Sequence, residues 1–152
     1  MQYGMDIAKY RRYYLVAQVF LMTTILETKK ILIVDDDQAA LTTLSGSLRS
    51  PGVEVVTASR LESAEAALEK YFFELVIADI RMSGILGVEG LELLRYVKTN
   101  SPKTKVIIIS GSGSEDLRKQ ALERGADHYC DKPVDIEALM HRVREMGICS
   151  LQ

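Results

Sequence analysis

The chain has too little cysteine for a disulfide scaffold or a zinc ribbon. Among its 152 residues there are only two cysteines, Cys130 and Cys149, and they do not form a CxxC pair. Such sparse use of cysteine argues against both architectures and fits the reducing environment of the cytoplasm. We therefore expect a cytoplasmic protein.

The chain also lacks a strong net charge. Its formal charge is −2, so no large field of one sign attracts nucleic acid or an anionic membrane. Apolar residues make up 47% and charged residues 26% of the chain, which excludes a disordered or collagen-like protein. A chain of this length buries about 68–70% of its unfolded surface, so it can hold a core without a disulfide or a structural metal. We expect one globular domain without direct nucleic-acid binding or membrane attachment.

Residues 1–28 differ in composition from the rest of the chain. Arg11 and Arg12 precede a mostly apolar run from Tyr13 to Leu26. This run is shorter than the span of about 20 apolar residues that crosses a membrane, and no small-x-small signal cleavage site follows it. Three interpretations stay open. Met22 is the true start of the protein, or the segment is an added helix that packs or pairs chains, or it contacts a membrane.

From residue 29 on, five short apolar runs alternate with helical patterns. The runs predict β-strands, and four of them are continuously apolar, as in parallel strands that are covered on both faces. They are Ile31–Val34, Val53–Val56, Leu75–Ala78, Val106–Ile109 and a weaker run at Tyr129–Cys130. Between the runs, apolar residues recur at helical spacing, as at Ile136, Leu139, Met140 and Val143.

Five strand–helix units predict an α/β fold. We expect a doubly wound five-stranded parallel sheet of the flavodoxin-like type, with strand order 2-1-3-4-5 and an extra N-terminal segment. The domain would span residues 29–147, between an N-terminal extension (1–28) and a short tail (148–152). No helix-turn-helix pattern follows the fifth helical segment, so we expect a stand-alone domain.

Local signals for helix starts and ends agree with this pattern. Ser59 with Glu62, and Ser112 with Glu115, have the spacing of a capping box at a helix start. Pro51-Gly52 and Gly125 are typical of helix ends.

Polar residues follow four of the five strands. They are Asp35, Asp36 and Asp37 after the first strand, Asp79 after the third, Ser110 after the fourth and Lys132 after the fifth. In an open α/β sheet, ligands bind at the carboxyl ends of the strands. We therefore expect these side chains to converge at one edge of the sheet.

Converging carboxylates repel one another and favour a cation between them. Two unit charges 4 Å apart interact by about 4 kcal/mol at an effective dielectric constant near 20. Mg²⁺ relieves this repulsion and can bridge phosphate oxygens during phosphoryl transfer. A neighbouring carboxylate can then act as the nucleophile and form an aspartyl phosphate. Lys132 would pair with one phosphate oxygen, and Ser110 would donate a hydrogen bond to another.

Each of these residues also has an ordinary structural explanation. An Asp at a strand end is commonly a turn residue or a helix N-cap, and a single Ser110 or Lys132 is commonly surface polarity. Because independent caps need not converge, three polar strand ends together with a lysine favour a site. Residues 111–114 lack the Gly-Lys-Ser/Thr of a P-loop, and His128, His141 and the two cysteines lack metal-site spacing.

Four segments of the chain carry a resemblance to a known family. ILIVDDD, LVIADIRMSG, VIIISGSG and HYCDKP, in this order on successive strand–helix units, resemble the receiver domain of two-component response regulators. The resemblance covers about residues 29–147 and includes the spacing of Asp36, Asp79, Ser110 and the Lys132-Pro133 pair. It implies a phosphorylation switch in signal transduction rather than an enzyme.

The resemblance implies which groups carry the chemistry. Asp79 would be the phosphoacceptor, and Lys132 would pair with the phosphoryl group. The Mg²⁺ ligands would be Asp35, Asp36, Asp79 and the backbone carbonyl of Arg81. The phosphoryl group would come from a sensor histidine kinase or a phosphotransfer protein.

The resemblance also implies how the signal leaves the site. Ser110 and Tyr129 would be the switch residues, with Ser110 moving toward the phosphoryl group and Tyr129 turning inward. The surface around residues 111–128 would then act on a separate output protein. A homodimer would form through the face made by the last two helical segments and the strand between them. The Lys132–Pro133 bond is often cis in this family.

The segment after Asp79 departs from the usual pattern of the family. Ser83 stands where the family usually has Pro, and the following GILGVEG stretch is longer than the common form. Both features concern the geometry of this loop and the lifetime of the phosphoryl group.

Two other functions stay open on the sequence alone. Asp35-x-Asp37 with a later Ser and Lys also resembles haloacid-dehalogenase-type phosphatases, in which Asp35 would be the nucleophile and Asp37 the acid/base. That interpretation leaves Asp79 without a role. The second is a degenerate receiver that acts as a scaffold. A flavin-binding protein is disfavoured, because the first strand–helix turn is acidic where a phosphate-binding turn would be neutral and rich in glycine.

Overall fold

The computed structural model describes residues 7–26, 28–82, 87–111 and 114–149. Helices and strands alternate along these residues after an N-terminal helix. The elements are α1 (Ile7–Leu26), β1 (Lys29–Val34), α2 (Gln38–Leu48), β2 (Val53–Ala58), α3 (Leu61–Lys70), β3 (Leu75–Asp79), α4 (Glu89–Asn100), β4 (Lys105–Ser110), α5 (Glu115–Glu123), β5 (His128–Asp131) and α6 (Ile136–Glu145).

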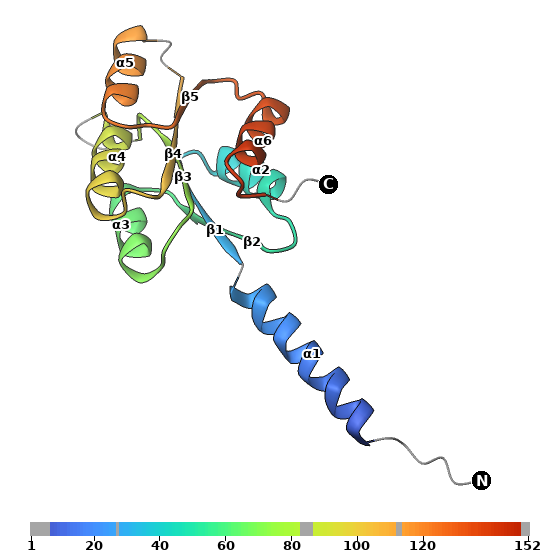
Figure 1. Cartoon of the computed structure of the whole chain (residues 1–152). Coiled ribbons are helices and arrows are strands. Elements are labelled where there is room, and N and C mark those ends of the chain that lie inside the picture. The colour runs from blue at the N-terminus through green and yellow to red at the C-terminus, as the bar shows by residue number, and fades with distance from the viewer. Residues whose placement is uncertain (1–6, 27, 83–86, 112–113, 150–152) are drawn as a thin grey trace.

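The five strands form one parallel sheet in the order β2-β1-β3-β4-β5. Helices α2 and α6 cover one face of the sheet, and α3, α4 and α5 cover the other (Figure 1). The predicted α/β fold, its strand order and its doubly wound arrangement are therefore confirmed. Each predicted strand coincides with an observed one to within two residues at either end.

The core has two halves, one on each face of the sheet, and the strands alternate between them. In β1, Ile31 and Ile33 pack with the apolar residues of α2 and α6, whereas Leu32 and Val34 pack with those of α3, α4 and α5. All four side chains are fully buried. A strand that is covered on both faces needs apolar residues at every position, which explains the continuous apolar runs.

Among the described residues, side chains cap three of the helices at their first turn. Asp37 accepts a hydrogen bond from Ala39 N at 2.9 Å and so begins α2, and Ser114 and Asp135 cap α5 and α6 in the same way. The prediction of a cap at Ser59 is wrong, because α3 begins one residue later, with Arg60 at the N-cap position and no side-chain cap bond. Ser112, the other predicted cap, lies outside the described residues.

Helix α1 extends away from the sheet (Figure 1). The N-terminal segment is thus helical from Ile7 to Leu26. The large side chains between Ile7 and Met22 are mostly exposed, with Tyr13 at 66% and Phe20 at 73%. Across the residues described here, none of the helices combines the length and the apolar content that crossing a bilayer requires.

Candidate functional site

The carboxyl ends of β1, β3, β4 and β5 bring the predicted site residues together. Asp79 is the last residue of β3 and Ser110 the last residue of β4, while Asp35 and Lys132 each follow a strand directly. Parallel pairing aligns Val34 of β1 with Ala78 of β3, so Asp35 and Asp79 leave the sheet side by side. The strand register thus accounts for their meeting across 44 residues of sequence.

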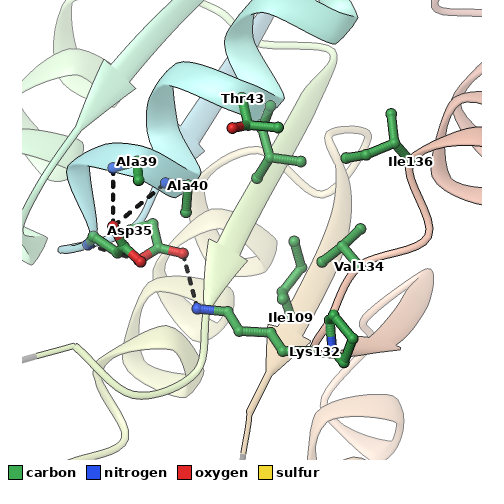
Figure 2. A pocket seen from close by; sticks show the side chains of 11 residues that line it. Asp35, Ala39, Ala40, Thr43, Ile109, Lys132, Val134 and Ile136 are labelled. Carbon is green, nitrogen blue, oxygen red and sulfur yellow. Dashed lines mark hydrogen bonds and ion pairs between the residues drawn. The ribbon is translucent and has the colours of Figure 1, made fainter.

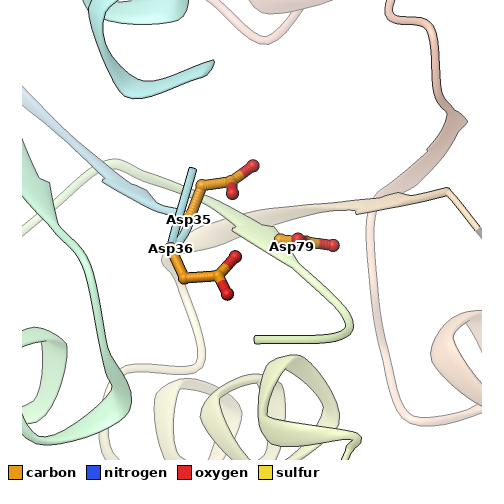
Figure 3. A group of neighbouring side chains, drawn as sticks. All are labelled: Asp35, Asp36 and Asp79. Carbon is orange, nitrogen blue, oxygen red and sulfur yellow. The ribbon is translucent and has the colours of Figure 1, made fainter. Parts of the chain in front are cut away.

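Three carboxylates gather at this edge of the sheet (Figure 3). Asp35, Asp36 and Asp79 each offer an oxygen, and these oxygens lie within 4.8 Å of one another. Asp35 and Asp79 are buried, at 2% and 6% exposure, whereas Asp36 is exposed. An all-oxygen, acidic donor set with one side open to solvent suits a hard divalent cation such as Mg²⁺, which keeps several waters of its own. The triad is the acidic set that the resemblance implied as ligands of Mg²⁺.

The amine of Lys132 lies between the two buried acids. Its Nζ donates to Asp35 Oδ2 at 3.1 Å and to Asp79 Oδ2 at 3.2 Å, and Figure 2 shows the bond to Asp35. Burial lowers the pKa of Lys132, but the hydrogen bond to Asp35 and the charges of Asp79 and Asp35 outweigh it, so the pKa is raised. The side chain is therefore a permanent cation at this edge of the sheet.

Burial is the main influence on the pKa of the Asp79 carboxyl group. Burial and the neighbouring charge of Asp35 raise the pKa of Asp79, although the charge and hydrogen bond of Lys132 and the hydrogen bond from Arg81 N oppose them. A buried carboxylate next to another acid is stabilised by any additional cation. The site is thus suited to binding a divalent ion together with an anionic group.

The backbone and side chain of Asp79 are held in place by the start of the next loop and by α4. Arg81 N donates to Asp79 Oδ1 at 3.3 Å, and Gly90 N donates to Ile80 O at 3.1 Å. A Cβ at Gly90 would lie 2.3 Å from Asp79 O, so only glycine lets α4 approach the end of β3 this closely. Sequence reasoning missed Gly90, although a glycine in the first turn of a helix is a usable signal. Ser83 and the first part of the long loop lie outside the described residues.

Ser110 and Tyr129 lie behind the acids on β4 and β5. Ser110 is fully buried, and its carbonyl accepts a hydrogen bond from Lys132 N at 2.8 Å. Tyr129 pairs with Ile108 across the sheet and is only 4% exposed. The ring was expected to turn inward during the switch, but in this structure it already lies inside the protein. The peptide bond between Lys132 and Pro133 is cis, as the resemblance implied.

A cavity of about 300 Å³ opens beside the acids, between the start of α2 and the loop after β5 (Figure 2). Asp35, Asp37 and Lys132 form its polar side. The rest of the lining is mostly apolar and consists of Ala39, Ala40, Thr43, Leu44, Ile109, Pro133, Val134 and Ile136. This concave surface was not predicted from the sequence, because three segments that are far apart in the chain form it together.

The described cysteines and histidines lie outside this acidic cluster. Among the described residues, Asp35, Asp36 and Asp79 form the group whose ligand atoms are close enough to share a metal ion. Burial and the charge of Asp131 raise the pKa of the Cys130 thiol, which disfavours the reactive thiolate.

Comparison with curated proteins links this site to a family. The model of the response regulator receiver domain matches residues 31–144. The transcriptional regulatory protein ZraR of Klebsiella oxytoca is 38% identical over 120 residues, which are 78% of this chain and 26% of that protein. The phosphate regulon transcriptional regulatory protein PhoB of Rhizobium meliloti (strain 1021) is 33% identical over 117 residues, or 77% of this chain and 51% of that protein. The chain thus spans between a quarter and a half of the length of these relatives.

Solved structures show the same likeness. A CheY-like response regulator receiver domain protein from Methanospirillum hungatei JF-1 has a TM-score of 0.71 and 36% identity, with 77% of this chain and 91% of that chain covered. The beryllofluoride-activated NtrC4 receiver domain dimer has a TM-score of 0.70 and 31% identity, with 77% and 94% covered.

The matched region contains the whole acidic cluster together with Ser110, Tyr129 and Lys132. A receiver domain is a signalling module rather than a classical enzyme, and it acts with histidine kinases. The phosphatase alternative, which left Asp79 without a role, is therefore not supported. From its sequence match, its sheet order and its acidic edge, this chain belongs to the response regulator receiver domain family.

Proposed function

We propose that this chain is a phosphorylation-dependent switch whose phosphoacceptor is Asp79. The observation that carries the proposal is the position of the Lys132 amine, within 3.2 Å of both Asp35 and Asp79. A lysine that already pairs with two buried acids can pair with an incoming phosphoryl oxygen at the same place. The receiver domain would span residues 29–147, with 1–28 as an extension and 148–152 as a tail.

The chemistry is the transfer of a phosphoryl group to a carboxylate. An Asp79 oxygen attacks the phosphorus of a phosphohistidine on a sensor histidine kinase or a phosphotransfer protein. The P–N bond breaks, an acyl phosphate forms, and the imidazole leaves with the electron pair. Lys132 pairs with one phosphoryl oxygen, and the Ser110 hydroxyl donates to another.

The residues present fit a Mg²⁺ ion. Asp35, Asp36, Asp79 and the backbone carbonyl of Arg81 would hold it, with Asp36 on the solvent side. When bound, the ion supplies positive charge to the phosphoryl oxygens as charge develops on them. The chain's own contribution is to keep two acids buried and a third exposed around one point.

Output would leave through the surface around residues 111–128, which holds α5 and the connections on either side of it. Movement of Ser110 toward the phosphoryl group would leave room for the Tyr129 ring. This room favours the inward position of the ring. The changed surface would act on a separate output protein in the cytoplasm. A homodimer through α5, β5 and α6 is a second route for the output, and the dimer of the beryllofluoride-activated NtrC4 receiver domain supports it.

Intact-protein mass spectrometry after incubation with acetyl phosphate and Mg²⁺ tests the proposal. We expect the wild-type chain to gain one phosphoryl group and the Asp79→Asn variant to gain none. Asp116→Asn, an exposed carboxylate at the start of α5, should be labelled like the wild type. Removal of Mg²⁺ with a chelator should prevent labelling. Undiminished labelling of Asp79→Asn would refute the assignment, and an unlabelled wild type that also fails to bind beryllofluoride would favour the scaffold alternative.

A further inference from the structure

Tyr129 is buried in a way that does not satisfy its hydroxyl group. The ring is 4% exposed, and the buried hydroxyl has no hydrogen-bond partner among the residues that the structure describes. Leaving a polar group buried and unpaired is costly compared with exposing it to water. Some other contact must therefore compensate for keeping this ring inside.

Arg118 of α5 makes that contact from the outer side. Its guanidinium carbon lies 5.5 Å from the centroid of the Tyr129 ring, within the range of a cation–π interaction. Arg118 Nη1 also lies 3.9 Å from Asp131 Oδ2, two residues beyond Tyr129 on β5. The arginine thus crosses from α5 to β5 over the ring and ties the two elements together.

The two contacts of Arg118 differ in weight. The side chains of Arg118 and Asp131 are 44% and 59% exposed, and an ion pair between such exposed groups contributes little. The ring face, by contrast, is covered by the guanidinium and is otherwise buried, so the cation–π contact is the specific one. Because Tyr129 pairs with Ile108 of β4, its position is also linked to the strand that ends in Ser110.

We propose that Arg118 is a positioning residue for the switch. It holds the Tyr129 ring inward and so couples the exposed side of α5 to the phosphoacceptor edge of the sheet. This inference rests on the proposed function, in which phosphorylation of Asp79 favours the inward ring. Arg118 contacts Tyr129 and Asp131 rather than Lys132 or the three acids of the site, so its effect on the site passes through Tyr129.

A double-mutant cycle tests the contact itself, without any phosphoryl group. The variants are Arg118→Ala, Tyr129→Leu and their combination, with Lys119→Ala on the same helix as the matched control, since Lys119 pairs with Glu123 instead. We expect a coupling of about two- to fivefold in the unfolding equilibrium constant between Arg118 and Tyr129. We expect none between Lys119 and Tyr129. Additive effects of Arg118→Ala and Tyr129→Leu would overturn the proposed contact.

Beryllofluoride binding tests the positioning role, because a purely structural contact would not change the affinity for beryllofluoride. If the Tyr129 ring points outward in a fraction of the molecules, those molecules must first turn the ring inward before they bind. The apparent affinity for beryllofluoride then falls by that fraction. Arg118→Ala should therefore bind beryllofluoride with Mg²⁺ about two- to fivefold more weakly than the wild type. Lys119→Ala should bind like the wild type, and Arg118→Ala should have no effect in the Tyr129→Leu background.

The two failures can be told apart. A wild-type chain that does not bind beryllofluoride contradicts the proposed function, and the unfolding cycle then still decides whether Arg118 holds the ring. A wild-type chain that binds, with Arg118→Ala binding equally well, overturns the positioning role and leaves Asp79 as the phosphoacceptor.

Discussion

Helix α1 and strand β1 follow one another in the chain and are both rich in apolar residues, yet their environments are opposite. In α1, Leu15 and Val19 are 54% and 63% exposed, whereas Leu32 and Ile33 of β1 are fully buried. β1 lies between β2 and β3 and has helices on both faces, while α1 extends away from the sheet (Figure 1). Apolar residues are buried only where other elements provide surfaces to cover them.

The largest expected effect comes from making the same substitution, Leu to Ala, in β1 and in α1 and comparing the two results. Leu32→Ala leaves a cavity in the core, so the free energy of unfolding should fall by about 3–5 kcal/mol. Leu15→Ala in α1 should change it by no more than about 0.5 kcal/mol. Urea unfolding monitored by circular dichroism measures both. A loss in Leu15→Ala comparable to that in Leu32→Ala would break the comparison, because it would mean that α1 is packed in solution.

Two helical glycines extend the comparison of buried and open surroundings to the backbone. A Cβ at Gly90 in α4 would collide with Asp79 O and with Ile80 Cα at 2.6 Å, whereas a Cβ at Gly46 in α2 would meet nothing within 4 Å. Gly90→Ala should therefore destabilise the protein by about 1–3 kcal/mol. Gly46→Ala should stabilise it by about 0.5–1 kcal/mol.

Thermal unfolding of the two glycine variants tests whether the added Cβ is crowded at position 90 and unhindered at position 46. Acetyl phosphate labelling of folded Gly90→Ala adds a second measurement, since the collision involves the backbone of the phosphoacceptor. If Gly90→Ala and Gly46→Ala had equal stability, the close approach of α4 to the end of β3 would be contradicted.

The smallest expected effect concerns charge at the buried edge. Because folding raises the pKa of Asp79, the folded state binds its proton more tightly than the unfolded state does. Its ionisation therefore costs stability, and this cost appears as the pH rises through the unfolded and then the folded pKa. Asp79→Asn should be more stable than the wild type near neutral pH.

The pH dependence of this difference is the diagnostic measurement. The gain of Asp79→Asn should disappear as the pH falls below the ordinary pKa of aspartate, about 3.9, because both states of the wild type are then protonated. Urea unfolding at several pH values, without added Mg²⁺, measures it, and Asp116→Asn provides an exposed control. A gain that persists unchanged in acid would contradict the role of Asp79 ionisation.

Several parts of the site could be predicted because they depend on chain order. In a parallel sheet every strand ends at the same edge, so Asp35, Asp79, Ser110 and Lys132 had to come near one another once the strands were recognised. Motif spacing gave the family for the same reason. The cap at Ser59 was predicted wrongly, because a spacing rule cannot tell which of two adjacent residues begins a helix.

Other parts could not be predicted, because they depend on contacts between elements. The approach of Gly90 to Asp79, the cavity between α2 and the loop after β5, and the position of Arg118 over Tyr129 are of this kind. Each depends on how one element packs against another, even where the two elements follow one another in the chain, as α5 and β5 do. No local pattern states how far one helix is rotated or shifted against a strand.

The amino-acid sequence by itself determined the alternation of strands and helices, the two-sided burial of the sheet and the edge at which the acids gather. Tertiary structure alone decided that the amine of Lys132 lies between Asp35 and Asp79, that Arg118 covers Tyr129 and that α1 stays uncovered. The physical reason is that hydrophobic periodicity is a local property of the chain. The distance between two side chains on different elements is set by the packing of the whole domain.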